Sequence, residues 1–342
     1  MAVKKKDEPA VDVIIPTYNG MPWLKATVES VLNQTHKNLK LYVIDDGSTD
    51  DGLTEKFIKR LKDARVTYHK KENGGQATAR NYGVKISGSP FIAFLDSDDI
   101  WYPTKLEKQL AVMKKSPAVG LVYGHQYNID EDDVILGNLR IWKRGHIFND
   151  LCAGNFIAGS ASMVLIRREV FNEVGLFKED FLIGEDWEMW LRVAKNYEVD
   201  FVPEILAGLR QRTEGMQQNQ KKMADGLMYN YEFMRRELGL TKPQEKIMAA
   251  YCLYHASVGY MSIGRRGLAR QALLKLFMIT PRQALQFDHW KLHFSFGLYT
   301  KAVLGNPVTD LLVKIYRKLR DVIRTALIAI YHVIRPVKHP TE

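Results

Sequence analysis

Three carboxylates follow directly on an apolar run and could together hold a metal ion. Asp96, Asp98 and Asp99 come after residues 91–95, whose apolar side chains predict a buried strand. Like charges this close repel each other, so a bound cation would stabilise the cluster. Oxygen ligands of this kind suit Mg²⁺ or Mn²⁺, which commonly bridge protein carboxylates to a diphosphate. The pattern fits equally a metal–nucleotide site and an acidic loop that caps a helix from Pro103 onward.

A second acidic pair stands at the start of a predicted helix. Glu185 and Asp186 follow Gly184, and apolar spacing predicts a helix over residues 185–196. The amino terminus of a helix stabilises negative charge, so both carboxylates could be simple partners of the helix dipole. Alternatively one of them is a general base, with the aromatic ring of Trp187 beside it for stacking on a sugar-like ligand.

Alternating strands and helices must position these groups. Apolar runs predict strands over residues 11–16, 39–44, 66–68 and 91–95, and helical spacing predicts helices over 22–34, 53–61 and 73–86. This alternation indicates a parallel, doubly wound sheet, in which ligands bind beyond the carboxyl ends of the strands. Polar clusters follow three strands, at residues 16–19, 45–50 and 96–99. They form either one nucleotide site or three separate solvated loops.

The rest of the chain changes character about two thirds of the way along. Strands are predicted over residues 119–123, 162–166 and 199–202, with a short helix over 168–174 that Gly175 closes. After Gln217 strand patterns disappear, and helical spacing continues to the end with breaks near Gly239, Gly264, Pro281 and Pro307. We therefore expect an α/β domain over residues 1–217 and a helical region over 218–342.

Charge and composition narrow the class of protein. The 342 residues carry a net charge of +10 with a pI of about 9.3, which suggests an anionic partner such as a nucleotide, an acidic membrane surface or nucleic acid. Cys152 and Cys252 have no metal-ligand or redox spacing, so we expect both to be buried in a protein of a reducing compartment. No secretory signal is expected, and no apolar run reaches the roughly 20 residues that span a bilayer.

Five motifs in one order resemble those of a known family. The chain resembles family 2 glycosyltransferases of the GT-A fold over residues 10–212, although each motif alone is weak. The resemblance rests on the segments 11–19, 45–50, 73–81, 96–99 and 184–192, which read VDVIIPTYN, DDGSTD, NGGQATARN, DSDD and GEDWEMWLR.

The resemblance implies a fold and an activity. The fold would be α/β, with a Rossmann-like mixed sheet sandwiched by helices and a helical C-terminal region. The activity would be inverting transfer of a hexosyl or N-acetylhexosaminyl group from a nucleotide-diphospho-sugar, most often UDP-linked. A divalent metal ion, Mn²⁺ or Mg²⁺, would be the cofactor. The acceptor would be a hydroxyl of a glycan or lipid-linked glycan in cell-surface polysaccharide synthesis.

The resemblance also implies roles for individual residues. Asp98 matches the metal ligand, with Asp96 beside it and near the ribose, and Asp46 matches the residue that hydrogen-bonds uracil. Asp186 matches the catalytic base, Glu185 would orient the acceptor or assist, and Trp187 would contact the acceptor. Arg80 would contact the diphosphate or lie on the helix surface. The donor-binding set is Pro16, Thr17, Tyr18, Asp46, Gly75, Arg80, Asp96 and Ser97.

One departure from the family pattern concerns the metal. Many relatives carry a histidine three residues after an arginine that follows the last strand, and here Thr213 takes its place. Coordination would then be incomplete, or would use Glu214 or water, or Arg210 or Arg212 would bind phosphate instead. Strict metal dependence is therefore less firmly implied than the three carboxylates alone suggest.

The C-terminal segment has a basic amphipathic pattern. Apolar residues share one helical face over residues 312–330, and residues 301–342 hold eight Lys or Arg against three Asp or Glu. Such a helix either lies on an anionic membrane surface or packs on the catalytic domain or on a second subunit in a homo-oligomer. With lipid-linked acceptors implied, we expect a cytoplasmic protein, peripheral at the inner face of the cytoplasmic membrane.

Three other functions compete with the transferase. A nucleotidyltransferase would need a Gly-rich, basic loop where residues 16–20 read PTYNG, which argues against it. A catalytically weak nucleotide-sugar or glycan-binding protein would not need Asp98 and Asp186, although Thr213 keeps this alternative open. No nucleic-acid partner is expected, because residues 1–210 show no basic stripe with interleaved aromatics.

Overall fold

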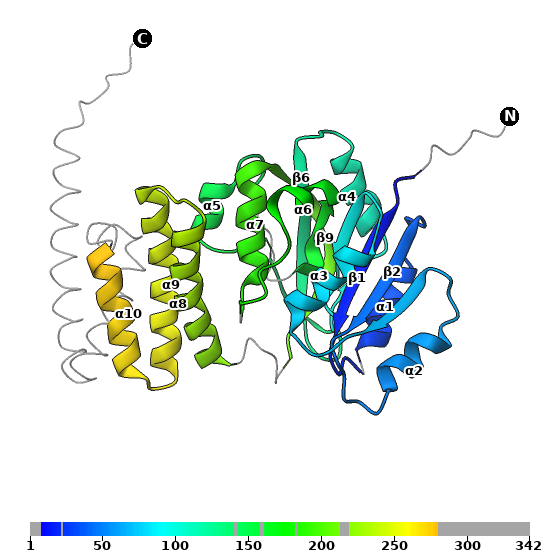
Figure 1. Ribbon diagram of the computed structural model, residues 1–342, viewed down its shortest axis with the longest axis horizontal. Coiled ribbons are helices and arrows are strands. Elements are labelled where there is room, and N and C mark those ends of the chain that lie inside the picture. Colours follow the sequence, from blue (N-terminus) through cyan, green and yellow to red (C-terminus); the bar gives the residue numbers. More distant parts are fainter. Residues whose placement is uncertain are drawn as a thin grey trace, which may run out of the picture.

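A mixed sheet lies between helices that cover both of its faces (Figure 1). The computed structural model describes residues 8–21, 23–139, 143–157, 161–181, 183–212 and 219–279. Alternate residues of the first strand enter different cores: Ile14 belongs to one apolar cluster, whereas Val13 and Ile15 belong to the other. A strand buried on both faces explains why its sequence is an almost continuous apolar run.

Four parallel strands form the first half of the sheet, in the order β3-β2-β1-β4. Each of the three crossovers between successive strands contains a helix, as the alternating pattern predicts. The elements are β1 (Val11–Thr17), α1 (Leu24–Leu32), β2 (Leu39–Asp45), α2 (Leu53–Arg60), β3 (Val66–Lys70), α3 (Gln76–Ile86) and β4 (Phe91–Phe94).

The second half of the sheet departs from a purely parallel arrangement, and the mixed sheet that the family resemblance implies is confirmed. β8 is antiparallel to both β4 and β6, while β6 and β9 run parallel. The predicted strand over 162–166 is wrong at its start, because Ala161–Met163 forms a 3₁₀ turn. The elements are β5 (Ile100–Trp101), α4 (Lys105–Met113), β6 (Val119–Ile129), β7 (Ile135–Leu139), α5 (Phe148–Cys152), β8 (Leu165–Arg167), α6 (Arg168–Val174), α7 (Glu185–Asn196) and β9 (Glu198–Arg210).

Helix α3 lies unusually close to the sheet. A Cβ at Gly83 would stand 2.6 Å from a methyl carbon of Ile14, so only glycine lets the helix backbone approach β1 to this distance. The small residues Ala77 and Ala79 are also buried in the same helix. This close packing fixes the position of the side chains near the middle of α3, among them Arg80.

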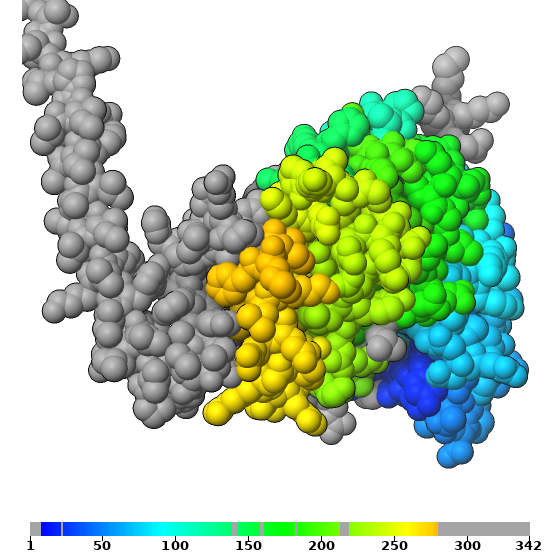
Figure 2. All heavy atoms as spheres, turned by 60° about the vertical axis from the view of Figure 1, so that its left-hand side comes forward, coloured from blue at the N-terminus to red at the C-terminus, as the bar shows by residue number. Residues whose placement is uncertain are grey.

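Three further helices pack beside α5 and α7, on the side away from the sheet. These are α8 (Gln220–Glu237), α9 (Lys242–Ser262) and α10 (Arg266–Ile279), which stand side by side (Figure 1) and form one face in the space-filling view (Figure 2). Gly239 and Gly264 separate them, as predicted. Tyr231 of α8 and Met248 of α9 belong to the same apolar cluster as Trp190 of α7.

No helix in the described ranges has both the length and the apolar character needed to cross a membrane. The breaks predicted near Pro281 and Pro307, and the amphipathic helix predicted over 312–330, lie outside the described residues. The division of the chain at residue 217 stays a prediction, since one apolar cluster runs from the sheet into α8–α10.

Candidate active site

The loops after β1, β2 and β4 meet at one edge of the sheet. The N–H of Asn19 donates to Ser48 Oγ at 2.9 Å, and the N–H of Thr49 donates to Asn19 Oδ1 at 2.9 Å. Thr27 Oγ1 donates to the carbonyl of Ser97 at 3.0 Å, which places the third loop against the start of α1. The first two polar clusters are therefore bonded to each other, and the third is bonded to the helix that follows the first.

The carboxylate of Asp46 joins this edge to the loop before α3. It accepts hydrogen bonds from Lys71 Nζ at 2.6 Å, from the N–H of Gly74 at 3.0 Å and from the N–H of Gly75 at 2.7 Å. Gly75 has a φ of +91°, which glycine adopts at little cost. An ionised carboxylate offers about four acceptor positions. Three are filled here, and one remains for an N–H group of a ligand.

The residues around the end of β1 present a polar and an aromatic group. Pro16 lies within β1 opposite Ile44 of β2. Thr17 is buried, and its Oγ1 has no hydrogen-bond partner in the part of the chain that the structure describes. Tyr18 is 50% exposed, so its ring is accessible to a flat ligand. Together they offer a hydroxyl and a stacking surface beside Asp46.

Asp98 and Asp99 differ in their surroundings. Asp99 is buried and accepts from Ser162 Oγ at 2.6 Å and from the N–H of Arg210 at 2.9 Å, so it holds the end of β9 against the loop. Asp98 Oδ2 instead accepts from Arg212 Nη1 at 3.2 Å. Asp99 therefore has a structural role that we did not predict, while Asp98 is the carboxylate available to a ligand.

Arg80 bridges the strand end and the helix start. Its Nη2 donates to Asp96 Oδ1 at 2.7 Å, and its Nη1 donates to Glu185 Oε1 at 2.6 Å. Gln76 Nε2 also donates to Asp96 Oδ1, at 2.8 Å. Burial alone would lower the pKa of Arg80, but the charges of Asp96 and Glu185 raise it. Both expected positions for this side chain, against a diphosphate or on the helix surface, are wrong, because the guanidinium is buried and both terminal nitrogens are paired.

The residues after β4 fit a metal ion that is shared with a substrate. Burial, followed by the charge of Asp96, raises the pKa of Asp98, and burial together with both neighbours raises that of Asp99 well above its usual range. A divalent cation would relieve this repulsion. Within the described ranges no three His, Cys, Asp or Glu side chains gather into a metal site. Asp96 and Asp98 are the two residues that would hold such a cation through carboxylate oxygens, which suit Mg²⁺ and Mn²⁺.

Asp186 is the second residue of α7, which begins at Glu185 directly after Gly184, whose φ is +75°. Its Oδ1 accepts from the N–H of Trp187 at 2.6 Å, and its Oδ2 accepts from Asn155 Nδ2 at 3.3 Å. The residue is 9% exposed. Burial, and then the charge of Glu185, raise the pKa of Asp186 to about 7. A carboxylate that is partly ionised near neutral pH is suited to accept a proton.

The aromatic ring that we expected to contact the acceptor belongs to the core. Trp187 is 3% exposed, and its Nε1 donates to the carbonyl of Leu151 at 2.9 Å. Its ring centroid lies 5.3 Å from that of Tyr251 on α9, in an edge-to-face arrangement. The expectation for Trp187 is therefore wrong, since a stacked sugar needs an open ring face.

Sequence reasoning missed three polar residues whose hydrogen bonds position the carboxylates or the segment before α7. Ser162 accepts from the N–H of Asp96 at 3.0 Å as well as donating to Asp99. Asn230 of α8 donates to the carbonyl of Ile183 at 3.1 Å, just before α7, and Asn155 binds the proposed base. Ser162 is a single polar residue in an apolar run, which is a detectable sign of a buried hydrogen bond. The two asparagines carry no such local sign.

Arg210 cannot serve as the phosphate ligand that we considered. Its Nε donates to the carbonyl of Asp98 at 2.9 Å, its Nη1 to that of Asp130 at 2.7 Å, and its Nη2 to Asp133 Oδ1 at 2.6 Å. Its side chain is only 2% exposed. Arg210 therefore joins two loops: the one that contains Asp98, and the turn between β6 and β7.

Arg212 differs from Arg210 in its exposure. Its side chain is 39% exposed, its guanidinium lies 4.6 Å from the ring centre of Trp23, and it pairs with Asp98. A partly exposed guanidinium beside a carboxylate can also take a phosphate oxygen. Thr213 and Glu214 lie outside the described residues, so the consequence of the missing histidine stays a prediction.

Comparison with known sequences assigns the chain to a family. The model for glycosyl transferase family 2 matches residues 12–175. The Escherichia coli enzyme WfgD, a UDP-Glc:alpha-D-GlcNAc-diphosphoundecaprenol beta-1,3-glucosyltransferase, is 34% identical over 197 residues, which cover 57% of this chain and 74% of that protein. The chain belongs to glycosyl transferase family 2.

Other relatives are longer than this chain. An uncharacterized glycosyltransferase of Rickettsia bellii is 37% identical over 224 residues, which cover 64% of this chain and 31% of that protein. The matched part is 38% of the length of a second such protein, from Rickettsia felis. The chain thus spans about a third of these Rickettsia relatives.

Two solved structures share the fold. S. aureus TarS in complex with UDP-GlcNAc has a TM-score of 0.62 at 16% identity, covering 93% of this chain and 92% of that one. The mannosyltransferase PcManGT of Pyrobaculum calidifontis, in complex with GDP-Man and Mn²⁺, has a TM-score of 0.58 at 18% identity, covering 89% and 87%. The fold of this chain is therefore the GT-A fold.

Proposed function

We propose that this chain is an inverting glycosyltransferase that moves a sugar from a UDP-sugar to a hydroxyl of a lipid-linked glycan. The observation that carries the proposal is the pairing of Arg80 with two carboxylates. One terminal nitrogen of its guanidinium donates to Asp96 on the donor side, and the other donates to Glu185, which is next to Asp186. A metal-site carboxylate and a base are thereby kept at a fixed separation. The activity of WfgD supports the choice of donor and acceptor class.

In this proposal Asp186 accepts the proton of the acceptor hydroxyl. The hydroxyl oxygen forms the new bond to the anomeric carbon, and the bond from that carbon to the diphosphate breaks on the opposite face with its electron pair leaving on the diphosphate. Asn155 orients the carboxylate of Asp186 through its 3.3 Å hydrogen bond. Glu185 is paired with Arg80 and therefore does not take the proton itself. Its charge instead helps to keep the pKa of Asp186 high.

The donor side uses the groups at the sheet edge. Tyr18 stacks on the base, Thr17 Oγ1 and the free acceptor position of Asp46 take hydrogen bonds from the nucleoside, and Arg212 meets the diphosphate. Asp96 and Asp98 would hold a divalent ion, and such an ion would neutralise charge on the leaving diphosphate. With that charge neutralised, the departing diphosphate would need no general acid.

A panel of donors tests the activity. The full chain is incubated with Mn²⁺ and UDP-glucose, UDP-N-acetylglucosamine, UDP-galactose or GDP-mannose, with and without a GlcNAc-diphospho-lipid. We expect slow release of the nucleoside diphosphate from one UDP-sugar and faster release with the lipid. Asp98→Asn should lose this release, while the exposed Asp132→Asn, in the turn after β6, should keep it.

Two results would contradict the proposal. Absence of both binding and hydrolysis with every donor would exclude an enzyme of this class. Tight donor binding without turnover, under all acceptor conditions, would instead favour the catalytically weak nucleotide-sugar-binding protein.

The remaining assignments depend on the same proposal. We propose residues 1–217 as the catalytic domain and residues 218–342 as a helical region that binds a membrane surface or a second subunit. Because the acceptor is lipid-linked and the donor is a nucleotide sugar, we assign the protein to the cytoplasm, peripheral at the inner face of the cytoplasmic membrane. The basic segment 312–330 is the part that would bind anionic lipid.

A further inference from the structure

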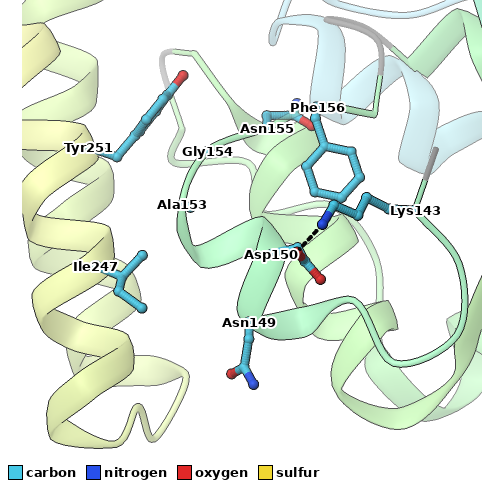
Figure 3. A pocket seen from close by; sticks show the side chains of 9 residues that line it. All are labelled: Lys143, Asn149, Asp150, Ala153, Gly154, Asn155, Phe156, Ile247 and Tyr251. Carbon is cyan, nitrogen blue, oxygen red and sulfur yellow. Dashed lines mark ion pairs between the residues drawn. The ribbon is translucent and has the colours of Figure 1, made fainter. Parts of the chain in front are cut away.

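A cavity of about 500 Å³ opens between α9 and the segment 143–156 (Figure 3). This volume lies within the range of small-molecule sites, roughly 300–1,000 Å³. None of the residues assigned to the donor or the metal lines it. The lining residues are Lys143, Asn149, Asp150, Ala153, Gly154, Asn155, Phe156, Ile247 and Tyr251.

The cavity is connected to the proposed base at one end. Asn155, which lines it, donates to Asp186 Oδ2 at 3.3 Å. Tyr251, on the opposite wall, packs against Trp187, the residue that follows Asp186. Figure 3 shows both side chains at the same end of the cavity. Asp186 itself does not line the cavity, and Asn155 is the residue that connects the cavity wall to its carboxylate.

Both ends of the cavity have a fixed shape. Gly154 has a φ of +133°, and a Cβ at this position would stand 2.5 Å from a ring carbon of Tyr251, so the loop can rest on the tyrosine ring only with glycine here. At the other end Gln244 Nε2, in the first turn of α9, donates to Asn149 Oδ1 at 2.8 Å. These contacts tie α9 to both the start of α5 and the loop after it, and keep the two walls apart.

We propose that this cavity binds a pyranose ring of the acceptor and that Asn155 and Tyr251 position the attacking sugar at Asp186; this rests on the proposed transferase function. A pyranose has apolar C–H faces and a rim of hydroxyl groups. The ring of Phe156 suits the faces, while the Tyr251 hydroxyl and the amide and carboxylate oxygens suit the hydroxyls.

A water-accessible ion pair adds to this polar rim. Lys143 Nζ lies 2.8 Å from Asp150 Oδ1, and the two side chains are 49% and 39% exposed. A pair this exposed contributes little to folding and can exchange its hydrogen bonds with sugar hydroxyls. The helical layer thus takes part in the reaction by forming one wall of the acceptor site.

The test fills the cavity and measures sugar binding directly. Ile247→Trp places a larger side chain in the cavity from α9, and Ile263→Trp makes the same change at the 38% exposed residue that ends the helix. Saturation-transfer NMR with methyl N-acetyl-α-glucosaminide, methyl α-glucoside and methyl β-galactoside needs no donor. We expect one of them to bind the wild type and the Ile263→Trp variant equally, and to bind Ile247→Trp at least about tenfold more weakly, a change of about 1.4 kcal/mol.

Asp150→Asn covers the case in which Ile247→Trp does not fold. It keeps the shape of the cavity, and we expect it to weaken sugar binding severalfold while thermal unfolding is unchanged. Equal binding to all variants, or no binding of any pyranoside to the wild type, would overturn the proposal. Nucleotide release by the wild type in the donor panel reports separately on the proposed function, so the two failures are distinguishable.

Discussion

Replacing Asp186 by asparagine should abolish sugar transfer and at the same time stabilise the fold. Burial, and then Glu185, raise the pKa of Asp186 from 3.8 to about 7. Between these two pH values the folded protein keeps a proton that the unfolded chain has released, so stability falls as the pH rises through this window. At about 1.4 kcal/mol per pH unit, the loss reaches about 4 kcal/mol above pH 7. Asparagine cannot ionise and escapes this loss.

Urea unfolding at three pH values measures the effect. Relative to the wild type, the free energy of unfolding of Asp186→Asn should be nearly unchanged at pH 3.5, higher by roughly 1–2 kcal/mol at pH 5 and higher by about 4 kcal/mol at pH 8. Transfer should fall by roughly 10²–10⁴-fold, the usual contribution of a general base. Binding of UDP, measured by calorimetry, should change little, because Asp186 contacts none of the donor-side residues.

Asp132→Asn is the matched control, since this carboxylate is exposed in the turn after β6 and should alter neither quantity. If Asp186→Asn is no more stable than the wild type at pH 8, the carboxylate is not buried beside a like charge as described. If the variant still transfers sugar at the wild-type rate, another group is the base. A gain that is equal at pH 3.5 and pH 8 would show that packing, and not ionisation, is responsible.

Two further predictions concern charge. Arg80→Met leaves two carboxylates without their shared cation and should lower the free energy of unfolding by roughly 3–5 kcal/mol. The control Arg144→Met breaks an ion pair between a 65% exposed side chain and Asp200, and should cost no more than about 1 kcal/mol. Similar losses for both variants in urea unfolding would mean that the Arg80 bridge is weak. The full chain should co-sediment with phosphatidylglycerol vesicles and not with phosphatidylcholine vesicles, and less so at 0.5 M salt, because the segment 312–330 is basic; equal recovery with both lipids would instead favour a packed helix or a homo-oligomer.

Elements whose pattern is local were predictable from the sequence. α6 begins and ends as predicted, because Gly175 has a φ of +81° that stops the helix, and α7 begins after Gly184 for the corresponding reason at its start. β1 was predicted from an apolar run that is buried on both faces. The order of the five motifs also indicated the carboxylates of the site, although the cluster at residues 96–99 alone fits an acidic loop equally well.

The tertiary structure decided how these groups are paired and which of them are accessible. Arg80 and Glu185 are 105 positions apart, and no spacing in the sequence indicates that one guanidinium joins the metal-site loop to the helix of the base. Trp187 follows the proposed base Asp186 in the first turn of α7, and its position in the sequence suggested a contact with the acceptor. In the fold its ring packs against Tyr251 of α9 instead. Asn155 was unremarkable in sequence and binds Asp186 only because the loop after α5 lies against α7. Periodicity and turn chemistry are properties of neighbouring residues, whereas pairing and burial depend on segments that the fold alone brings together.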